Sequence, residues 1–165
     1  VDGRPVILWP DTFNNHFNPE VAKAAVEVLE HVGCHVIVPR PSLCCGRPLY
    51  DYGFLPTAKK MLLQIMDALH DEIEQGIPIV GLEASCAVVF RDELLQMFPM
   101  DEDAKRLSEQ TFTLVGPTEA DLKSGKLSAE SPVAKALIGA KAGDVVQVET
   151  PRGARKWRVD GLGAG

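Results

Sequence analysis

The sequence lacks any apolar run near the roughly 20 residues that a helix needs to cross a membrane, so no membrane span is expected. Aromatic residues make up only 6% of the chain, and cysteine occurs four times in 165 residues. So few cysteines, with no visible secretory signal, predict reduced thiols or metal ligands in a cytoplasmic protein, not a disulfide scaffold. A formal net charge of −6 argues against nucleic-acid binding through bulk charge.

What the sequence does contain is a pair of adjacent thiols, Cys44 and Cys45, in the stretch Leu-Cys-Cys-Gly-Arg-Pro over residues 43–48. Glycine favours a turn, and proline lacks the backbone donor that a helix interior or a central strand requires. The two thiols are therefore expected to be presented in a loop, not packed. A third thiol, Cys86, ends the stretch 81–86. The pattern favours one shared site, and the alternative is that these cysteines are small buried apolar residues.

Strand and helix signals alternate through residues 1–114. Apolar runs predict strands over 6–9, 34–38 and 77–82, and amphipathic stretches predict helices over 19–32, 56–75, 86–97 and 100–110. This alternation predicts an α/β, Rossmann-like domain with a parallel sheet. Ligands of such sheets bind at the carboxyl ends of the strands, so Asp11, the Cys44–Cys45 pair and the segment from Glu83 to Cys86 are expected to face one crevice.

Three stretches resemble the cysteine-rich CCG domain, which occurs in the iron–sulfur subunits of glycolate and D-lactate oxidases and in heterodisulfide reductases. They are Leu8–Phe13, Cys44–Asp51 and Gly81–Leu94, within residues 5–114. The resemblance implies a fragment of a 2-hydroxy-acid oxidoreductase that transfers electrons beside a flavoprotein dehydrogenase domain or subunit. It also implies that Cys44, Cys45 and Cys86 hold an iron–sulfur cluster or act as redox thiols. No flavin site is expected in this chain, and the fragment is not expected to be active alone.

The chain departs from the fuller heterodisulfide reductase motif at two places. That motif has a cysteine where this chain has Asp11, and a Cys-x-x-Cys where this chain has Glu83-Ala84-Ser85-Cys86. Because carboxylates can ligate iron, the resemblance makes Asp11 and Glu83 auxiliary ligands. The spaced Cys-x-x-Cys-x-x-Cys runs of cubane ferredoxin clusters are absent.

The composition changes near Leu114: acidic residues outnumber basic ones before it, and the balance reverses after it. We therefore expect one domain over residues 1–114 and a second module over 115–165. In the second, Ser131 is expected to cap a helix, and strands over 145–149 and 154–159 are expected to form a hairpin. The module would be a small α+β unit.

Residues 115–160 resemble the end of the C-terminal domain of GreA/GreB, factors that bind bacterial RNA polymerase. The stretches that carry this resemblance are Val115–Asp121, Ser131–Gly139, Gly143–Val146 and Thr150–Gly153. It implies RNA polymerase as the partner. In those factors a long N-terminal coiled coil carries the acidic tip that reaches the polymerase active site, and no stretch here matches it, so binding without transcript cleavage is expected. The expected contacts are basic residues on and after the hairpin turn: Arg152, Arg155, Lys156 and Arg158. The alternatives are a basic hairpin with no partner and a chimera of two families.

Overall fold

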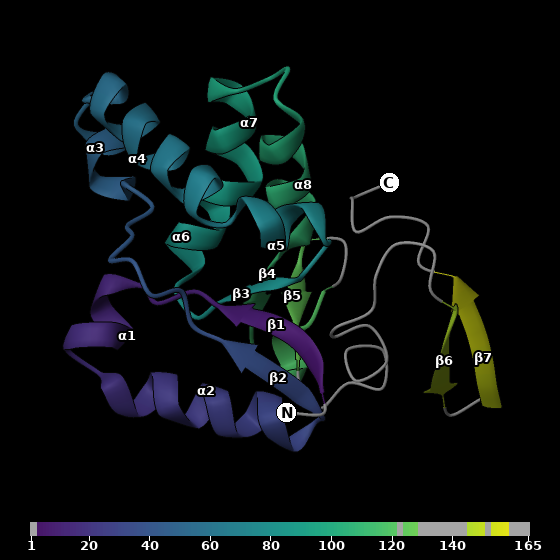
Figure 1. Cartoon of the computed structure of the whole chain (residues 1–165). Coiled ribbons are helices and arrows are strands. Elements are labelled where there is room, and N and C mark those ends of the chain that lie inside the picture. The colour runs from purple at the N-terminus through teal and green to yellow at the C-terminus, as the bar shows by residue number, and fades with distance from the viewer. Residues whose placement is uncertain (1–2, 122–123, 129–144, 151–152, 159–165) are drawn as a thin grey trace.

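The computed structural model of the chain describes residues 3–121, 124–128, 145–150 and 153–158. Its main sheet has five strands in the order β2-β1-β3-β4-β5, and every neighbouring pair is parallel (Figure 1). These strands are β1 (Arg4–Leu8), β2 (Cys34–Ile37), β3 (Ile79–Gly81), β4 (Thr111–Leu114) and β5 (Lys126–Leu127). The α/β parallel-sheet prediction is thus confirmed.

Helices cover both faces of this sheet, with α2 along one face and α4, α6 and α8 over the other (Figure 1). Their bounds are α1 (Thr12–His16), α2 (Pro19–His31), α3 (Arg47–Asp51), α4 (Leu55–Ala68), α5 (His70–Glu74), α6 (Ala84–Val88), α7 (Leu94–Met97) and α8 (Glu102–Gln110). A π-helical turn, η1 (Val89–Glu93), joins α6 to α7, and a 3-10 turn, η2 (Pro117–Glu119), follows β4. In the described part of the chain, none of these helices has the length and apolar character that crossing a bilayer would require.

The first strand divides the core in two because its side chains alternate between the faces of the sheet. Val6 and Leu8 belong to the cluster that includes Leu29 of α2. Ile7, together with Trp9 just after the strand, belongs to the larger cluster formed with α4, α6 and α8. A strand with apolar side chains on both faces needs helices packed on both faces of its sheet. This arrangement explains the continuous apolar run at residues 6–9.

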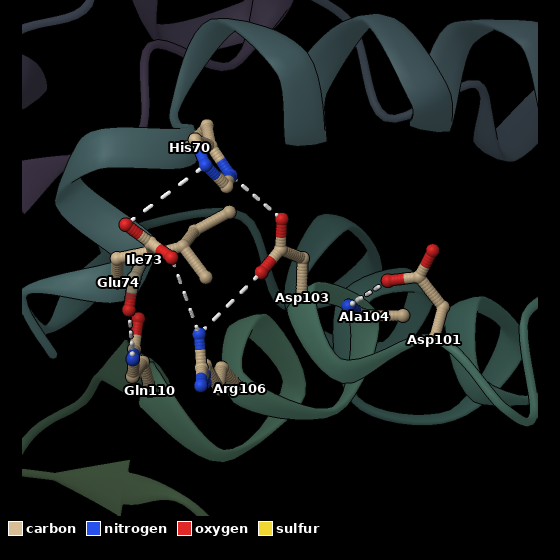
Figure 2. A network of polar contacts seen from close by, with 8 residues as sticks. All are labelled: His70, Ile73, Glu74, Asp101, Asp103, Ala104, Arg106 and Gln110. Atoms are coloured by element: carbon tan, nitrogen blue, oxygen red, sulfur yellow. Dashed lines mark hydrogen bonds and ion pairs between the residues drawn. The ribbon is translucent and has the colours of Figure 1, made fainter.

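The helix predicted over 56–75 is two helices in the structure. α4 ends at Ala68. The backbone of the next residue, Leu69 (φ −113°, ψ 14°), leaves the helical region, and α5 begins directly after it. The bend lets α5 pack on α8, where the Gln110 side-chain amide donates to the carbonyl oxygen of Ile73 at 2.9 Å (Figure 2). Because this contact joins residues 37 positions apart, no local sequence pattern could have predicted the break.

A polar network on the surface ties the same two helices together. His70 Nδ1 lies 2.8 Å from Asp103 Oδ2, and Arg106 lies 3.7 Å from the other oxygen of Asp103 and 4.0 Å from Glu74 (Figure 2). The hydrogen bond to Asp103 and its negative charge raise the pKa of His70 above its ordinary value. The His70–Asp103 pair therefore stabilises the folded state at pH values below the pKa that His70 has in the unfolded chain. That contribution is lost as the pH rises through the folded pKa.

Replacing Asp103 by asparagine is expected to lower the pKa of His70 toward its usual value, because the main source of the upward shift is removed. A titration of the histidine ring protons by NMR measures this. Asp71→Asn is the control, since Asp71 contributes least to the shift, and it should change the pKa of His70 much less. Equal shifts in the two variants would contradict the assignment to Asp103.

The segment after β4 contributes one more strand to the main sheet. Thr113 pairs with Lys126 and Leu114 with Leu127, both in parallel. The division into domains at Leu114/Val115 stays a prediction, and the short β5 lies beyond that division in sequence. The two-residue strand carries no periodic signal, so the sequence did not predict it.

A separate two-stranded sheet is formed by β6 (Val145–Thr150) and β7 (Gly153–Arg158). The strands are antiparallel, with register from Val145 opposite Arg158 to Thr150 opposite Gly153. The predicted hairpin is confirmed. The expected cap at Ser131 lies outside the described residues.

Candidate functional site

The candidate site lies where three loops leave the carboxyl edge of the sheet. Asp11 follows β1, the Cys44–Cys45 pair follows β2, and Cys86 lies in α6 just after β3. Parallel strands bring these ends to one edge, as the sequence predicts. Gly46 makes the turn from the cysteine loop into α3 with a φ of +77°, a conformation that favours glycine over residues with a Cβ atom.

The centre of the site is a pair of thiols in direct contact. Cys45 Sγ lies 3.0 Å from Cys86 Sγ, although the two residues are 41 positions apart. Both are free cysteines, with only 3% and 7% of their surface exposed. They belong to the same core cluster as Trp9 and Phe90, whose rings meet edge to face at 4.8 Å between centroids.

This burial corrects one expectation. The thiol pair was expected to be presented, but Cys45 is packed, and only Cys44 keeps partial exposure. The reason is tertiary: the loop closes over α4, and a Cβ atom added at Gly46 would come within van der Waals distance of Ala58 and Met61. Cys44 instead lines a cleft of about 470 Å³, together with Thr12, His16, Arg40, Met61 and Gln64 among others.

The three thiols are linked electrostatically. The hydrogen bond with Cys45 and burial raise the pKa of Cys44 well above the usual value of a thiol. For Cys45, the hydrogen bond with Cys44 lowers the pKa, but the contact with Cys86 and burial outweigh it and raise the pKa to about 11. Both groups are therefore held as thiols at neutral pH, a state that favours neither metal binding nor rapid nucleophilic attack.

We expect Cys44 to react slowly with iodoacetamide at neutral pH despite its partial exposure. Because alkylation needs the thiolate and the pKa of Cys44 is raised, the rate should rise about tenfold for each pH unit, without a plateau near the pKa of an ordinary thiol. Mass spectrometry of the Cys44 peptide over a pH series measures the rate, and the urea-unfolded chain is the control. A plateau for the folded chain at lower pH than for the unfolded chain would show the opposite shift.

The two carboxylates predicted as auxiliary ligands serve as helix caps. Asp11, which is buried, caps α1: its Oδ1 accepts from the backbone N–H of Asn14 at 2.9 Å, and its Oδ2 accepts from the Asn14 side-chain amide at 2.7 Å. Glu83 caps α6, where Oε1 accepts from the backbone N–H of Ser85 at 3.2 Å. Capping by side-chain oxygens explains both residues without a metal. Their ligand role stays a prediction.

Sequence reasoning missed three polar residues beside the thiols. Arg47 forms an ion pair with Glu93 and a weaker one with Asp51 at 3.5 Å. The hydroxyl of Tyr50 donates to Met97 Sδ at 3.2 Å, and its pKa is raised to about 12 by burial, by Glu93 and by Cys45. The signal for them was present, since Arg47 and Tyr50 lie in the same short stretch as Cys44 and Cys45, and Glu93 lies one helical segment after Cys86.

The comparisons with known proteins agree with this arrangement. Residues 11–91 match the family model for the cysteine-rich CCG domain. The chain is also 36% identical to lactate utilization protein A of Bacillus subtilis over 112 residues, which are 66% of this chain and 45% of that protein. The corresponding protein of Geobacillus kaustophilus is 37% identical over 102 residues, or 59% of this chain and 41% of that protein. No solved structure matches.

A second family matches the other end of the chain. Residues 102–161 match the model for the C-terminal part of transcription elongation factor GreA/GreB. GreA of Vibrio parahaemolyticus is 35% identical over 88 residues, 53% of each chain, and GreA of Chelativorans is 48% identical over 60 residues, 36% of this chain and 37% of that protein. The chain thus spans about half or less of the length of the curated relatives it matches. Both resemblances that the sequence indicated are confirmed.

Thiolates are the usual ligands of iron–sulfur clusters, so the donor chemistry of residues 11–91, which match the CCG model, is suitable. The placement of these thiols is not suitable for a cluster. A cluster is ordinarily held by four thiolates, whereas here two of three motif thiols touch each other. Within the described ranges, no group of three His, Cys, Asp or Glu side chains is placed to hold a metal ion. The side chains as they stand do not fit a four-thiolate cluster.

The fourth cysteine lies elsewhere. Cys34 begins β2 and is buried on the α2 side of the sheet, in the cluster with Val6 and Leu29. It is a packing residue, and it lies at the opposite end of the strand from the cysteine loop. It therefore provides a matched control for the three thiols of the site, Cys44, Cys45 and Cys86.

Of the four predicted polymerase contacts, Arg152 lies outside the described residues. Arg155, Lys156 and Arg158 lie on β7, opposite Val148, Gln147 and Val145. Lys156 is exposed. Their role in partner binding stays a prediction.

Proposed function

We propose that the CCG-type domain is a redox module that accepts electrons during the oxidation of a 2-hydroxy acid of the lactate or glycolate type. The observation that carries this proposal is the contact between Cys45 and Cys86 at the carboxyl edge of a parallel sheet. The likeness to lactate utilization protein A supports the substrate class. The hydride chemistry would belong to a flavoprotein dehydrogenase partner in the cytoplasm, and this chain would take the electrons from it.

Two states of the same thiols could carry the electrons. The dithiol of Cys45 and Cys86 already has the contact that a two-electron couple needs. An iron–sulfur cluster on Cys44, Cys45 and Cys86, with Asp11 and Glu83 as auxiliary ligands, would supply one-electron transfer, and it would require the two touching side chains to turn apart. Reconstitution with iron and sulfide under anaerobic conditions separates the two states, because only the cluster gives visible absorbance.

The experiment that tests the module uses a lactate-oxidising flavoprotein whose flavin has been reduced by lactate without oxygen. The chain is added either after oxidation of its thiols or after reconstitution with iron and sulfide, and flavin absorbance is followed. We expect one or both preparations to reoxidise the flavin, and Cys45→Ser and Cys86→Ser to abolish this while Cys34→Ser retains it. If neither folded preparation reoxidises the flavin, the proposal is wrong.

The chain by itself is expected not to oxidise lactate or glycolate. Abstracting a hydride from a 2-hydroxy acid needs an organic acceptor such as a flavin, which thiols cannot replace. Lactate, a dye acceptor and the chain are mixed with and without the flavoprotein, and dye reduction is recorded. Turnover without any flavin would contradict this expectation.

A second candidate function concerns residues 102–161, which match the GreA/GreB family model and include the β6–β7 hairpin. We infer that this segment attaches to RNA polymerase through Arg152, Arg155, Lys156 and Arg158 and does not stimulate transcript cleavage. Co-sedimentation with polymerase at low and high salt tests the binding, which should weaken with salt. A chain that matches both families in this way would be a chimera of the two. If the chain binds polymerase but does not reoxidise the flavin, residues 102–161 are its functional part.

A further inference from the structure

The three thiols of the site form a continuous series from the surface to the core. Cys44 lines the cleft of about 470 Å³ and is followed directly in the chain by Cys45, whose Sγ lies 3.0 Å from Cys86 Sγ. The inner two are almost completely buried, so a reagent in the cleft meets Cys44 first. An oxidising equivalent taken up at the surface could therefore be passed inward by exchange between sulfur atoms.

We propose that Cys45 and Cys86 close a reversible disulfide when a hydroperoxide oxidises Cys44, so that the loop is a site of reversible oxidative modification. This inference rests on the position of the thiols and not on the flavoprotein partner. A hydroperoxide is the oxidant class that suits the geometry, because it leaves only one oxygen atom on Cys44. A bulkier oxidant would leave a large group in front of Cys45.

The chemistry balances in three steps. The fraction of Cys44 that is thiolate attacks the terminal peroxide oxygen, so that an S–O bond forms, the O–O bond breaks and an alcohol or water leaves. Because the pKa of Cys44 is raised, this fraction is small at neutral pH, and the oxidation is slow there and faster at higher pH. Cys45 then attacks Cys44 Sγ and expels hydroxide, which takes up a proton as water. Finally, Cys86 attacks Cys45 Sγ and releases Cys44 as a thiol. Two thiols have lost two protons and two electrons, and the hydroperoxide has become an alcohol and water.

The last step is favourable for a geometric reason. A disulfide between neighbouring residues such as Cys44 and Cys45 closes a strained ring, whereas Cys45 and Cys86 come from separate elements. Their sulfur atoms need to approach by only about 1 Å to reach bonding distance. The disulfide therefore moves from the strained pair to the unstrained one, and Cys44 is regenerated for a second oxidation or for reduction by an external thiol.

The test uses the reduced full chain, treated with one equivalent of hydrogen peroxide and then digested without reductant. We expect the intact mass to fall by two hydrogen atoms and the linked peptide to join Cys45 to Cys86. Cys44→Ser should slow closure by about tenfold or more without changing the linkage, because the inner thiols are shielded from the oxidant. Cys34→Ser should close at the wild-type rate.

Other outcomes would overturn the proposal. A linkage that includes Cys34, a disulfide between two chains, or oxidation of Cys44 to the sulfinic acid with no linkage would each exclude an inward relay. Closure at the wild-type rate in Cys44→Ser would exclude Cys44 as the first acceptor. The wild-type linkage map remains decisive even if a serine variant does not fold. The peroxide experiment contains no flavoprotein. Disulfide closure can therefore be observed even if the flavin is not reoxidised in the other experiment, and flavin reoxidation can be observed even if the disulfide does not close.

Discussion

Replacing Trp9 by alanine is expected to lower the free energy of unfolding by about 3–5 kcal/mol. Trp9 is 1% exposed, and it lies at the junction of β1 with the larger core cluster, edge to face with Phe90. Removing the ring takes away its apolar contacts and leaves a cavity, because neighbouring side chains on the sheet and on α4 can relax only partly. Urea unfolding followed by circular dichroism measures the loss.

Two matched variants make this prediction specific. Trp9→Phe keeps an aromatic ring and removes the indole N–H, which is buried with no partner in the described structure, so it should cost clearly less than the alanine variant. Phe17→Ala removes a ring that is 72% exposed and should change stability by no more than about 0.5 kcal/mol. Similar losses for Trp9→Ala and Phe17→Ala would mean that Trp9 is not a core residue.

The same substitution should act on the thiol site. Trp9 shares its cluster with Cys45 and Cys86, so a cavity there admits water beside the sulfur atoms. Alkylation of Cys45 should then become faster in Trp9→Ala at equal pH, while alkylation of the distant Cys34 stays unchanged. This second measurement links the packing of the core to the chemistry of the site.

The sequence predicted three strands of the main sheet, β1, β2 and β3, because their signals are local. Val6, Ile7 and Leu8 are apolar on both sides of a strand, Pro19 and Gly33 bracket α2, and the alternation of such units permits few topologies. The pairing of β5 with β4 was not predictable, because Lys126 and Leu127 are too short a strand to show a period. The break at Leu69 was missed for the same kind of reason, since distant contacts between α5 and α8 accompany it.

The site was predicted in outline for a topological reason. Parallel strands end at one edge, so Cys45 and Cys86 were expected to meet there, and their sulfur atoms do. The burial of Cys45 was not predicted, because it depends on how closely the loop packs on Ala58 and Met61 of α4. The pairing of Arg47 with Glu93 joins residues 46 positions apart, and local spacing cannot specify such a contact.

That ion pair carries the second large effect. Arg47→Met is expected to lower the free energy of unfolding by about 1–3 kcal/mol, although it keeps an apolar side chain of similar length. Glu93 is mostly buried, and its Oε2 has no hydrogen-bond partner in the described structure. Removing the guanidinium leaves the carboxylate without its opposite charge next to the half-buried Tyr50. An unpaired charge in such a place is costly because water can replace the lost partner only in part.

A double-mutant cycle separates the pair from the packing of its members. Glu93→Gln removes the charge, so adding it to Arg47→Met should restore part of the lost stability, and the coupling should exceed about 0.5 kcal/mol. Lys23→Met provides the comparison, because Lys23 pairs with Glu20 in the open at 2.9 Å and should change stability by well under 1 kcal/mol. Additive losses for Arg47 and Glu93 would show that they act separately. A strong coupling energy between Arg47 and Glu93 would instead mean that their ion pair holds the start of α3, and with it the cysteine loop, in place against η1.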